Sequence, residues 1–169
     1  MKILQIPEAL LGVSLLLLGV PACAQTGKSP GKPPAGDPLY ANACYQGIEP
    51  GKEVCLKDGR SEGPPVVVLR AETATGDLDG DGKPETALLL IRSPGDPLQE
   101  IYLAVAASRG GRIVNLATTL LGNQVRVQSF EISGGKLHLQ AQRSASARTA
   151  MMPATMTFTL RDGKLVEEM

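Results

Sequence analysis

Apolar and polar residues alternate along much of the chain with a period of two, which is typical of a half-buried β-strand. The alternation is clearest at 136–142 and 155–160, and it also opens the segment 124–132. A strand of this kind turns one face toward a core and the other toward water. The pattern therefore predicts strands in these three segments.

Four further segments are short, mostly apolar runs without strict alternation, at 66–69, 86–91, 101–107 and 113–120. Runs of this length and composition also favour strands. The third run, together with the residues up to 111, is compatible with one short helix as well, because Ala and Leu favour helices.

Turn-forming residues separate these segments at the short intervals typical of all-β proteins. Asp162-Gly163 is the strongest hairpin signal in the chain, and Ser133-Gly134-Gly135 joins two alternating segments. Further turn sequences lie at 93–97 and 109–111. We therefore expect a single antiparallel all-β domain over residues 39–169, either a sandwich or an open barrel.

The composition limits the classes of function that the chain can have. Hydrophobic residues make up 43% of the 169 residues, which is enough for a core, so the chain as a whole is not disordered. The 17 basic and 17 acidic residues balance, and aromatic residues are 3% with no Trp, which argues against a nucleic-acid binder. One His and three Cys exclude a zinc enzyme that uses several histidines.

Residues 1–22 predict a signal peptide, since their apolar run of 12 residues is shorter than the roughly 20 that a membrane-spanning helix needs. The sequence Val20-Pro21-Ala22-Cys23 resembles the lipobox of bacterial lipoproteins, which would make Cys23 the lipidated first residue. Alternatively, Ala22-Cys23-Ala24 is an ordinary cleavage site of a protein secreted without a lipid. In a third interpretation the segment stays uncleaved as an anchor.

Residues 23–38 predict a tether, because 26–38 contain four prolines and three glycines and show no apolar periodicity. With Cys23 lipidated, the tether would hold the domain away from a membrane, since more than one acyl chain gives stable anchoring. By resemblance to lipoprotein sorting signals, Ala24 favours the outer membrane of a Gram-negative envelope. The predicted location is the cell envelope, lipid-anchored at the outer membrane or the periplasmic face, with a soluble periplasmic or secreted protein as the alternative.

The other two cysteines, Cys44 and Cys55, are an even pair in an exported domain and most simply form a disulfide. The turn sequence Glu49-Pro50-Gly51 between them suggests a hairpin-like bend closed by that bridge. A redox-active pair is the alternative, although the chain offers it neither a CxxC spacing nor a neighbouring His.

The segment 76–85, GDLDGDGKPE, places carboxylates at alternate positions of a glycine-containing loop. Hard oxygen ligands at such spacing can converge on one calcium ion, with a main-chain carbonyl completing the set. Gly80 and Gly82 let the backbone curl around the ion, and carboxylates this close would repel one another without it. An acidic, solvated turn is the alternative. The predicted calcium ligands are Asp77, Asp79, Asp81, the Lys83 carbonyl and Glu85.

This segment resembles the DxDGDGxxD loop of FG-GAP and VCBS-type β repeats, in which a loop between two strands binds calcium. Glu85 stands in place of their more usual final Asp. The segment is not an EF-hand, because Leu88 occupies the position of the bidentate Glu. A single copy in a chain of this length excludes a propeller, which needs several blades.

Most of residues 40–167 resembles a family of small bacterial exported proteins built around one GDLDGDG segment, which implies location and fold type more than activity. The late Cys-Cys-Pro-Thr segment common in that family is replaced here by Met151-Met152-Pro153-Ala154-Thr155, so any role of such a cysteine pair is absent. The resemblance rests on Asn42, Tyr45, Leu56, Asp58-Gly59, Glu62, 76–82, 103–105, 117–118, 121–122 and Leu165.

No set of catalytic residues accompanies the acidic segment. His138 lies on the polar face of its predicted strand, and the serines show no GxSxG sequence. The predicted function is a non-enzymatic binding or structural module of the envelope that holds one calcium ion. One alternative is an accessory subunit that docks another envelope protein through a strand edge or through the small-residue segment 143–148. Another alternative is a hydrolase that uses the Asp cluster.

Overall fold

The chain divides into two compact units, Met1–Pro30 and Gly31–Met169, and every described residue belongs to the second unit. The predicted signal peptide, Cys23 and all but the last residue of the predicted tether lie outside the described residues. In the part that is described, no helix is long and apolar enough to cross a membrane. The computed structural model describes residues 38–95, 99–144, 146 and 149–168.

The described residues form one four-residue helix and eleven strands. In chain order these are α1 (Pro38–Ala41), β1 (Cys44–Glu49), β2 (Lys52–Lys57), β3 (Arg60–Ser61), β4 (Val66–Gly76), β5 (Glu85–Ser93), β6 (Glu100–Arg109), β7 (Arg112–Gly122), β8 (Val125–Ser133), β9 (Lys136–Arg143), β10 (Met152–Arg161) and β11 (Lys164–Glu168).

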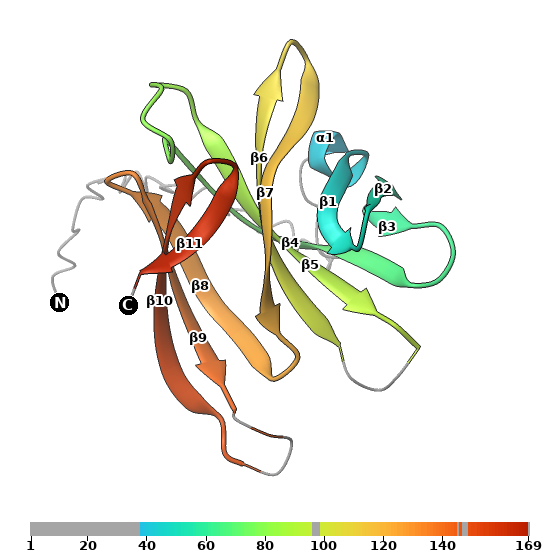
Figure 1. The fold of residues 1–169 in the computed structure, drawn as a ribbon, viewed down its shortest axis with the longest axis vertical. Coiled ribbons are helices and arrows are strands. Elements are labelled where there is room, and N and C mark those ends of the chain that lie inside the picture. Colours follow the sequence, from blue (N-terminus) through green and yellow to red (C-terminus); the bar gives the residue numbers. More distant parts are fainter. Residues whose placement is uncertain (1–37, 96–98, 145, 147–148, 169) are drawn as a thin grey trace, which may run out of the picture. The chain divides into compact units, whose positions relative to one another are not determined.

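The strands form two antiparallel sheets (Figure 1). The first sheet contains β1 to β7 in sequence order, and the second contains four strands in the order β11-β10-β9-β8. Every paired neighbour is antiparallel, as expected for strands joined by short turns. The predicted antiparallel all-β fold is therefore confirmed.

The seven-stranded sheet curls until its first and last strands lie beside each other. The backbone N–H of Gln46 in β1 donates a hydrogen bond of 3.0 Å to the side-chain oxygen of Asn115 in β7. Gly47 approaches β7 so closely that a Cβ at this position would lie 3.4 Å from Cβ of Thr118. The curled sheet is thus a nearly closed barrel with a side-chain core of its own.

The barrel core is apolar and includes two buried tyrosines, Tyr45 and Tyr102. The hydroxyl of Tyr45 donates a hydrogen bond to the backbone oxygen of Tyr40 at 2.8 Å, so the buried hydroxyl proton has a partner. Burial raises the pKa of Tyr45 well above its usual range, and the neighbouring Tyr40 adds a smaller increase. The buried members of this core are Ala43, Tyr45, Ile48, Leu56, Val67, Leu88, Leu90, Tyr102 and Ala104.

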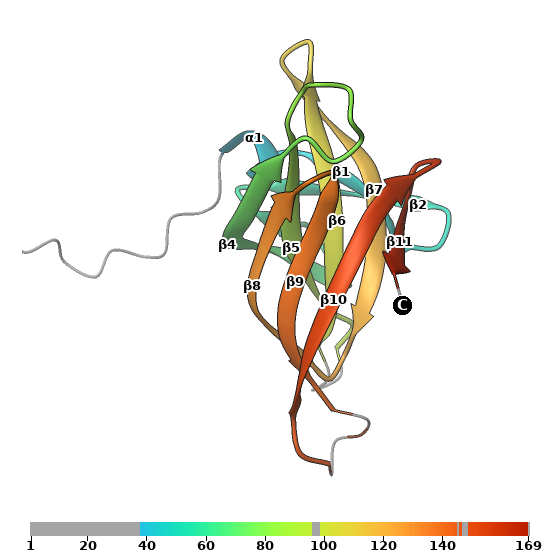
Figure 2. The ribbon, with the colours of Figure 1, turned by 90° about the vertical axis from the view of Figure 1, so that its left-hand side faces the viewer.

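A second core lies on the outer face of the barrel, where the four-stranded sheet packs against it (Figure 2). Its buried residues lie on β5, β6 and β7 of the barrel, in the loop before β5, and on β9 and β10 of the four-stranded sheet, and partly buried residues of β8 pack against them. The fold therefore combines the two predicted alternatives, a barrel and a sandwich. The buried members are Leu78, Ala87, Leu89, Leu103, Val105, Leu121, Leu137, Leu139, Ala141, Met156 and Phe158.

The central strands β5 and β6 belong to both cores. Leu88 points into the barrel while its neighbour Leu89 points toward the second sheet, and both are buried. Across the ladder, Leu103 pairs with Leu89, and Ala104 pairs with Leu88. Burial on both faces explains why these two segments are continuous apolar runs instead of alternating ones.

Each of the seven strands predicted from the sequence overlaps an observed strand, β4 to β10. The helical alternative for 101–111 is wrong, because β6 spans Glu100–Arg109 and forms ladders with both β5 and β7. Helix propensity is a weak preference, and pairing on both edges with burial on both faces outweighs it. The turn expected at Asp162-Gly163 joins β10 to β11.

The N-terminal hairpin of the barrel is closed by a disulfide between Cys44 and Cys55, as the cysteine count suggested. These residues are direct partners in the β1–β2 ladder, and the expected turn at Glu49-Pro50-Gly51 connects the strands. The segments that form β1, β2 and β3 carry no clear period-two pattern, which is why they were not expected as strands.

The end of β4 touches β8 at a point where only glycine fits. An ideal Cβ on Gly76 would lie 2.8 Å from Cγ2 and 2.9 Å from Cβ of Ile132. We expect Gly76→Ala to lower the free energy of unfolding by about 1–3 kcal/mol, because the two sheets must move apart to admit the methyl group. Chemical denaturation measures this change.

A second substitution at the contact separates overpacking from an effect on the backbone of β4. In Gly76→Ala combined with Ile132→Gly, removal of both Cγ2 and Cβ of Ile132 should leave room for the new methyl group. The double variant should then be more stable than the sum of the two single changes predicts. If the loss in free energy of unfolding of the double variant equalled the sum of the two single losses, the effect of Gly76→Ala would not be steric.

Candidate metal centre

The acidic loop connects the last residue of β4 to the first residue of β5, so both of its ends are held by the sheet. Gly76 and Glu85 are partners in the β4–β5 ladder, and residues 77–84 form the connection between them (Figure 1). Leu78 anchors the loop, because its side chain is buried in the core between the sheets.

Three of the four predicted carboxylates come together in this loop. One oxygen from each of Asp77, Asp79 and Glu85 lies within 4.8 Å of the others. The two aspartates are exposed, whereas Glu85 is buried with 1% of its surface accessible. The group therefore has an open side toward solvent and a closed side toward the sheet.

Glu85 is held in place by the backbone of the loop. Its Oε2 accepts hydrogen bonds from the N–H groups of Leu78 at 2.8 Å and Asp79 at 3.4 Å. Among the described residues no Lys, Arg or His forms an ion pair with this carboxylate. A buried carboxylate without a counter-charge is costly, and Asp77 and Asp79 beside it add further negative charge.

The aspartates fold the loop back on itself. Asp77 accepts hydrogen bonds from the N–H groups of Gly80 at 2.7 Å and Gly82 at 3.1 Å, and Asp79 accepts one from Asp81 at 3.0 Å. Gly80 and Gly82 both have φ of 80°, a conformation that other residues rarely adopt. Each carboxylate oxygen has a second lone pair, so these bonds leave acceptor capacity for an ion.

The fourth predicted carboxylate, Asp81, is not part of the close group. Its Oδ1 accepts the backbone N–H of Lys83 at 2.8 Å, and its Oδ2 lies 4.0 Å from the ammonium nitrogen of the same lysine. The roles of Asp81 and of the Lys83 carbonyl as calcium ligands stay predictions. Sequence reasoning missed the anchoring role of Leu78, for which its position between two aspartates gives no signal.

A second group of metal-ligating residue types consists of Cys44, Glu53 and Cys55. It offers no metal site as it stands, because both sulfur atoms are in the disulfide and a metal requires thiolates. Glu53 instead accepts a hydrogen bond from the side-chain amide of Gln46 at 3.2 Å.

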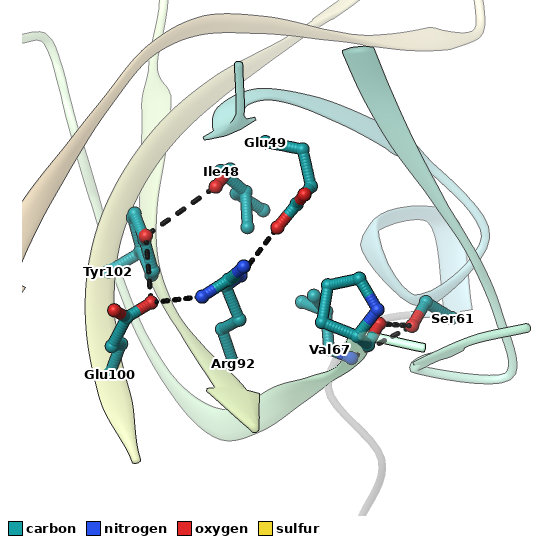
Figure 3. Close-up of polar contacts among 8 residues, drawn as sticks. Ile48, Glu49, Ser61, Val67, Arg92, Glu100 and Tyr102 are labelled. Carbon is teal, nitrogen blue, oxygen red and sulfur yellow. Dashed lines mark hydrogen bonds and ion pairs between the residues drawn. The ribbon is translucent and has the colours of Figure 1, made fainter. Parts of the chain in front are cut away.

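A polar network surrounds Arg92 near the end of β5 (Figure 3). The guanidinium forms ion pairs with Glu49 from β1 and with Glu100, its ladder partner in β6. The hydroxyl of Tyr102 donates a hydrogen bond to Glu100 at 3.1 Å, and the Ile48 carbonyl oxygen lies 3.5 Å from the same hydroxyl. Burial raises the pKa of Tyr102, and the hydrogen bond with Glu100 adds a smaller increase.

The network ties the disulfide hairpin to the central strands. Burial alone would lower the pKa of Arg92, but the hydrogen bonds with Glu100 and Glu49 raise it on balance. The guanidinium charge is thus matched by two carboxylates, as a cation needs where water is partly excluded. We interpret this cluster as structural, since its charged groups already satisfy one another.

The two remaining sequence candidates, His138 and the segment 143–148, make single polar contacts in the described part of the chain. Nδ1 of His138 lies 3.3 Å from Oγ1 of Thr157, its neighbour across the β9–β10 ladder. Within segment 143–148, residues 145, 147 and 148 lie outside the described residues. The described Arg143 places a guanidinium nitrogen 3.9 Å from a carboxylate oxygen of Glu167.

No family model, curated protein or solved structure matches the chain.

Proposed function

We propose that this chain is an exported protein of the cell envelope whose β domain binds one calcium ion and acts as a non-enzymatic binding or structural module. The observation that carries the calcium proposal is the buried carboxylate of Glu85, which has no cationic partner among the described residues. A cation held between Glu85, Asp77 and Asp79 would supply the missing charge.

Calcium suits the group better than other common ions. Hard oxygen donors on a flexible, glycine-containing loop match the variable coordination of Ca²⁺, whereas Mg²⁺ requires a rigid octahedral arrangement. Zn²⁺ prefers nitrogen and sulfur ligands, which the loop does not contain. In extracellular compartments a dissociation constant of about 10⁻⁴–10⁻³ M is sufficient for occupancy.

The proposed role of the ion is structural. It would hold the loop between β4 and β5 closed, and Glu85 begins a strand that contributes to both cores. For the envelope location, the support is the apolar run at 9–20 and the lipobox-like sequence ending at Cys23, both outside the described residues. The proposed anchor is therefore a lipid on Cys23.

The test is thermal unfolding of the full chain with millimolar calcium and with a chelator. Millimolar calcium is about 1–10 times a dissociation constant of 10⁻⁴–10⁻³ M, and this excess stabilises the folded state by about 0.4–1.4 kcal/mol, which corresponds to a rise of one to several degrees in Tm. We expect calcium to raise Tm and magnesium at the same concentration to raise it much less.

Matched variants locate the effect. Asp79→Asn should abolish the calcium-dependent rise while keeping the shape of the side chain. Asp162→Asn, in the turn between β10 and β11, makes the same chemical change away from the loop and should keep the full rise. The calcium proposal fails if Tm does not respond to calcium, or if Asp79→Asn responds as the unchanged protein does.

A further inference from the structure

The strand β8 forms an open edge of the second sheet (Figure 2). It pairs with β9 on one side, and no described strand forms a ladder with its other side. The backbone N–H and C=O groups of such an edge can pair with a further strand. Proline and lysine, which often protect an edge from this pairing, are absent from β8.

Space for a further strand lies beside β8 over part of its length. The strand β4 touches β8 near the end of β8, where Gly76 lies against Ile132. Toward the beginning of β8, a groove of about 630 Å³ separates the two strands. Both apolar and polar side chains line this groove, among them Thr73 of β4 and Val127 of β8. This part of the edge is therefore accessible from outside the domain.

A bulge gives β8 a symmetric pattern of faces. Val127 is the ladder partner of Ala141, Phe130 is the partner of Leu139, and both Val127 and Phe130 pack against the core. In a regular strand, residues three positions apart point to opposite faces. The shift in register between Val127 and Ser129 inserts one residue and brings the two side chains to the same face.

The charges of β8 follow the same symmetry. Arg126 and Glu131 are exposed, and neither forms an ion pair with any other described residue. Their ladder partners are Gln142 and His138, which lie on the face of β9 turned away from the core. Arg126 and Glu131 are equally distant along the strand from its centre, so a basic and an acidic group occupy equivalent positions on one face.

We propose that β8 pairs in antiparallel fashion with β8 of a second copy of this chain, about a two-fold axis at the centre of the strand. This pairing places Arg126 of each copy opposite Glu131 of the other, and Val127 opposite Phe130. Opposite charges in facing positions of an antiparallel pair attract each other. The two four-stranded sheets would then form one continuous sheet.

The register of this pairing is determined by both faces of the strand. A shift of one residue would place core-facing side chains opposite outward-facing ones, and it would separate Arg126 from Glu131. A bulge usually hinders the pairing of an edge strand. Here the bulges of the two copies meet at the axis, so the strands stay in phase on both sides of it. The inference goes beyond the proposed function, because it does not involve the acidic loop.

Sedimentation equilibrium of the full chain tests the pairing. We expect a monomer–dimer equilibrium that depends on protein concentration. Arg126→Glu and Glu131→Arg should each weaken dimerisation at least about tenfold, because both facing pairs then carry like charges. Arg112→Glu, at an exposed arginine that begins β7, is the matched control and should leave the dimer unchanged. Each variant is first shown to keep the Tm of the unchanged protein.

A mixture of the two weakened variants distinguishes this pairing from a general effect of charge. In a mixed dimer of Arg126→Glu with Glu131→Arg, both facing pairs are again oppositely charged. The equal mixture should therefore dimerise about as well as the unchanged protein. The double variant Arg126→Glu/Glu131→Arg should also recover dimerisation. Association through the apolar segment 9–20 would not depend on these charges.

Three results would overturn the inference. One is a chain that stays monomeric at every concentration, which would leave the edge to a strand of another protein. Another is dimerisation of Arg126→Glu and Glu131→Arg that equals that of the unchanged protein. The third is a mixture of these two variants that associates no better than either one alone.

Discussion

Leu88→Ala and Leu103→Ala should each lower the free energy of unfolding by about 2–5 kcal/mol, although the two side chains lie on opposite faces of one sheet. Leu88 fills the interior of the barrel, and Leu103 fills the core between the barrel and the second sheet. Both side chains are completely buried. Each substitution removes apolar contacts and leaves a cavity that the surrounding strands close only in part.

The comparison distinguishes this architecture from a sheet with one solvated face, where one of the two changes would have little effect. Chemical denaturation of both variants gives the two values. Val114→Ala on β7 is the control, because that side chain is 40% exposed and its truncation should change stability by less than about 1 kcal/mol. A neutral Leu88→Ala variant would contradict a packed barrel interior.

Removal of the disulfide should have an effect of similar size. The bridge closes a loop with a sequence separation of 11 between Cys44 and Cys55. The chain-entropy model assigns about 3 kcal/mol to a loop of this order, because the bridge restricts the unfolded chain. We expect the double variant Cys44→Ala/Cys55→Ala to lose about this much free energy of unfolding in chemical denaturation.

A reductant provides the matched control for this prediction. It should destabilise the unchanged protein by about the same amount and have no effect on the double variant. The hairpin also holds Glu49, which pairs with Arg92 on β5. If reduction left the stability unchanged, the hairpin would be held by that ion pair and its apolar contacts alone.

The strands of the second sheet were predictable because a single face of each one is buried. In β9, Leu137 and Leu139 are buried, and the residues between and after them are more exposed, as the sequence pattern indicated. The hairpin of β1 and β2 and its disulfide were expected, but the bounds of these strands and the presence of β3 were not predictable, because they depend on the closure of the barrel against β7.

The candidate metal centre was predictable in its residues but not in its environment. Spacing alone indicated that the carboxylates of Asp77, Asp79 and Glu85 could meet, and the structure brings these three together. The burial of Glu85 depends on its pairing with Gly76 and on the packing of Leu78, which are tertiary features. The bulges in β4 and β8 were not predictable either, because a bulge leaves at most a change of phase in the sequence of its strand.

Strands β5 and β6 contribute side chains to both cores, so the two cores should unfold together. If the second sheet or the other barrel strands detached from β5 and β6, an apolar face of these two strands would be exposed to water. Amide hydrogens of these strands should therefore exchange with solvent only through global unfolding, and should be the slowest in the domain. An ion bound at Glu85, the first residue of β5, would therefore slow the exchange of amide hydrogens around both cores together.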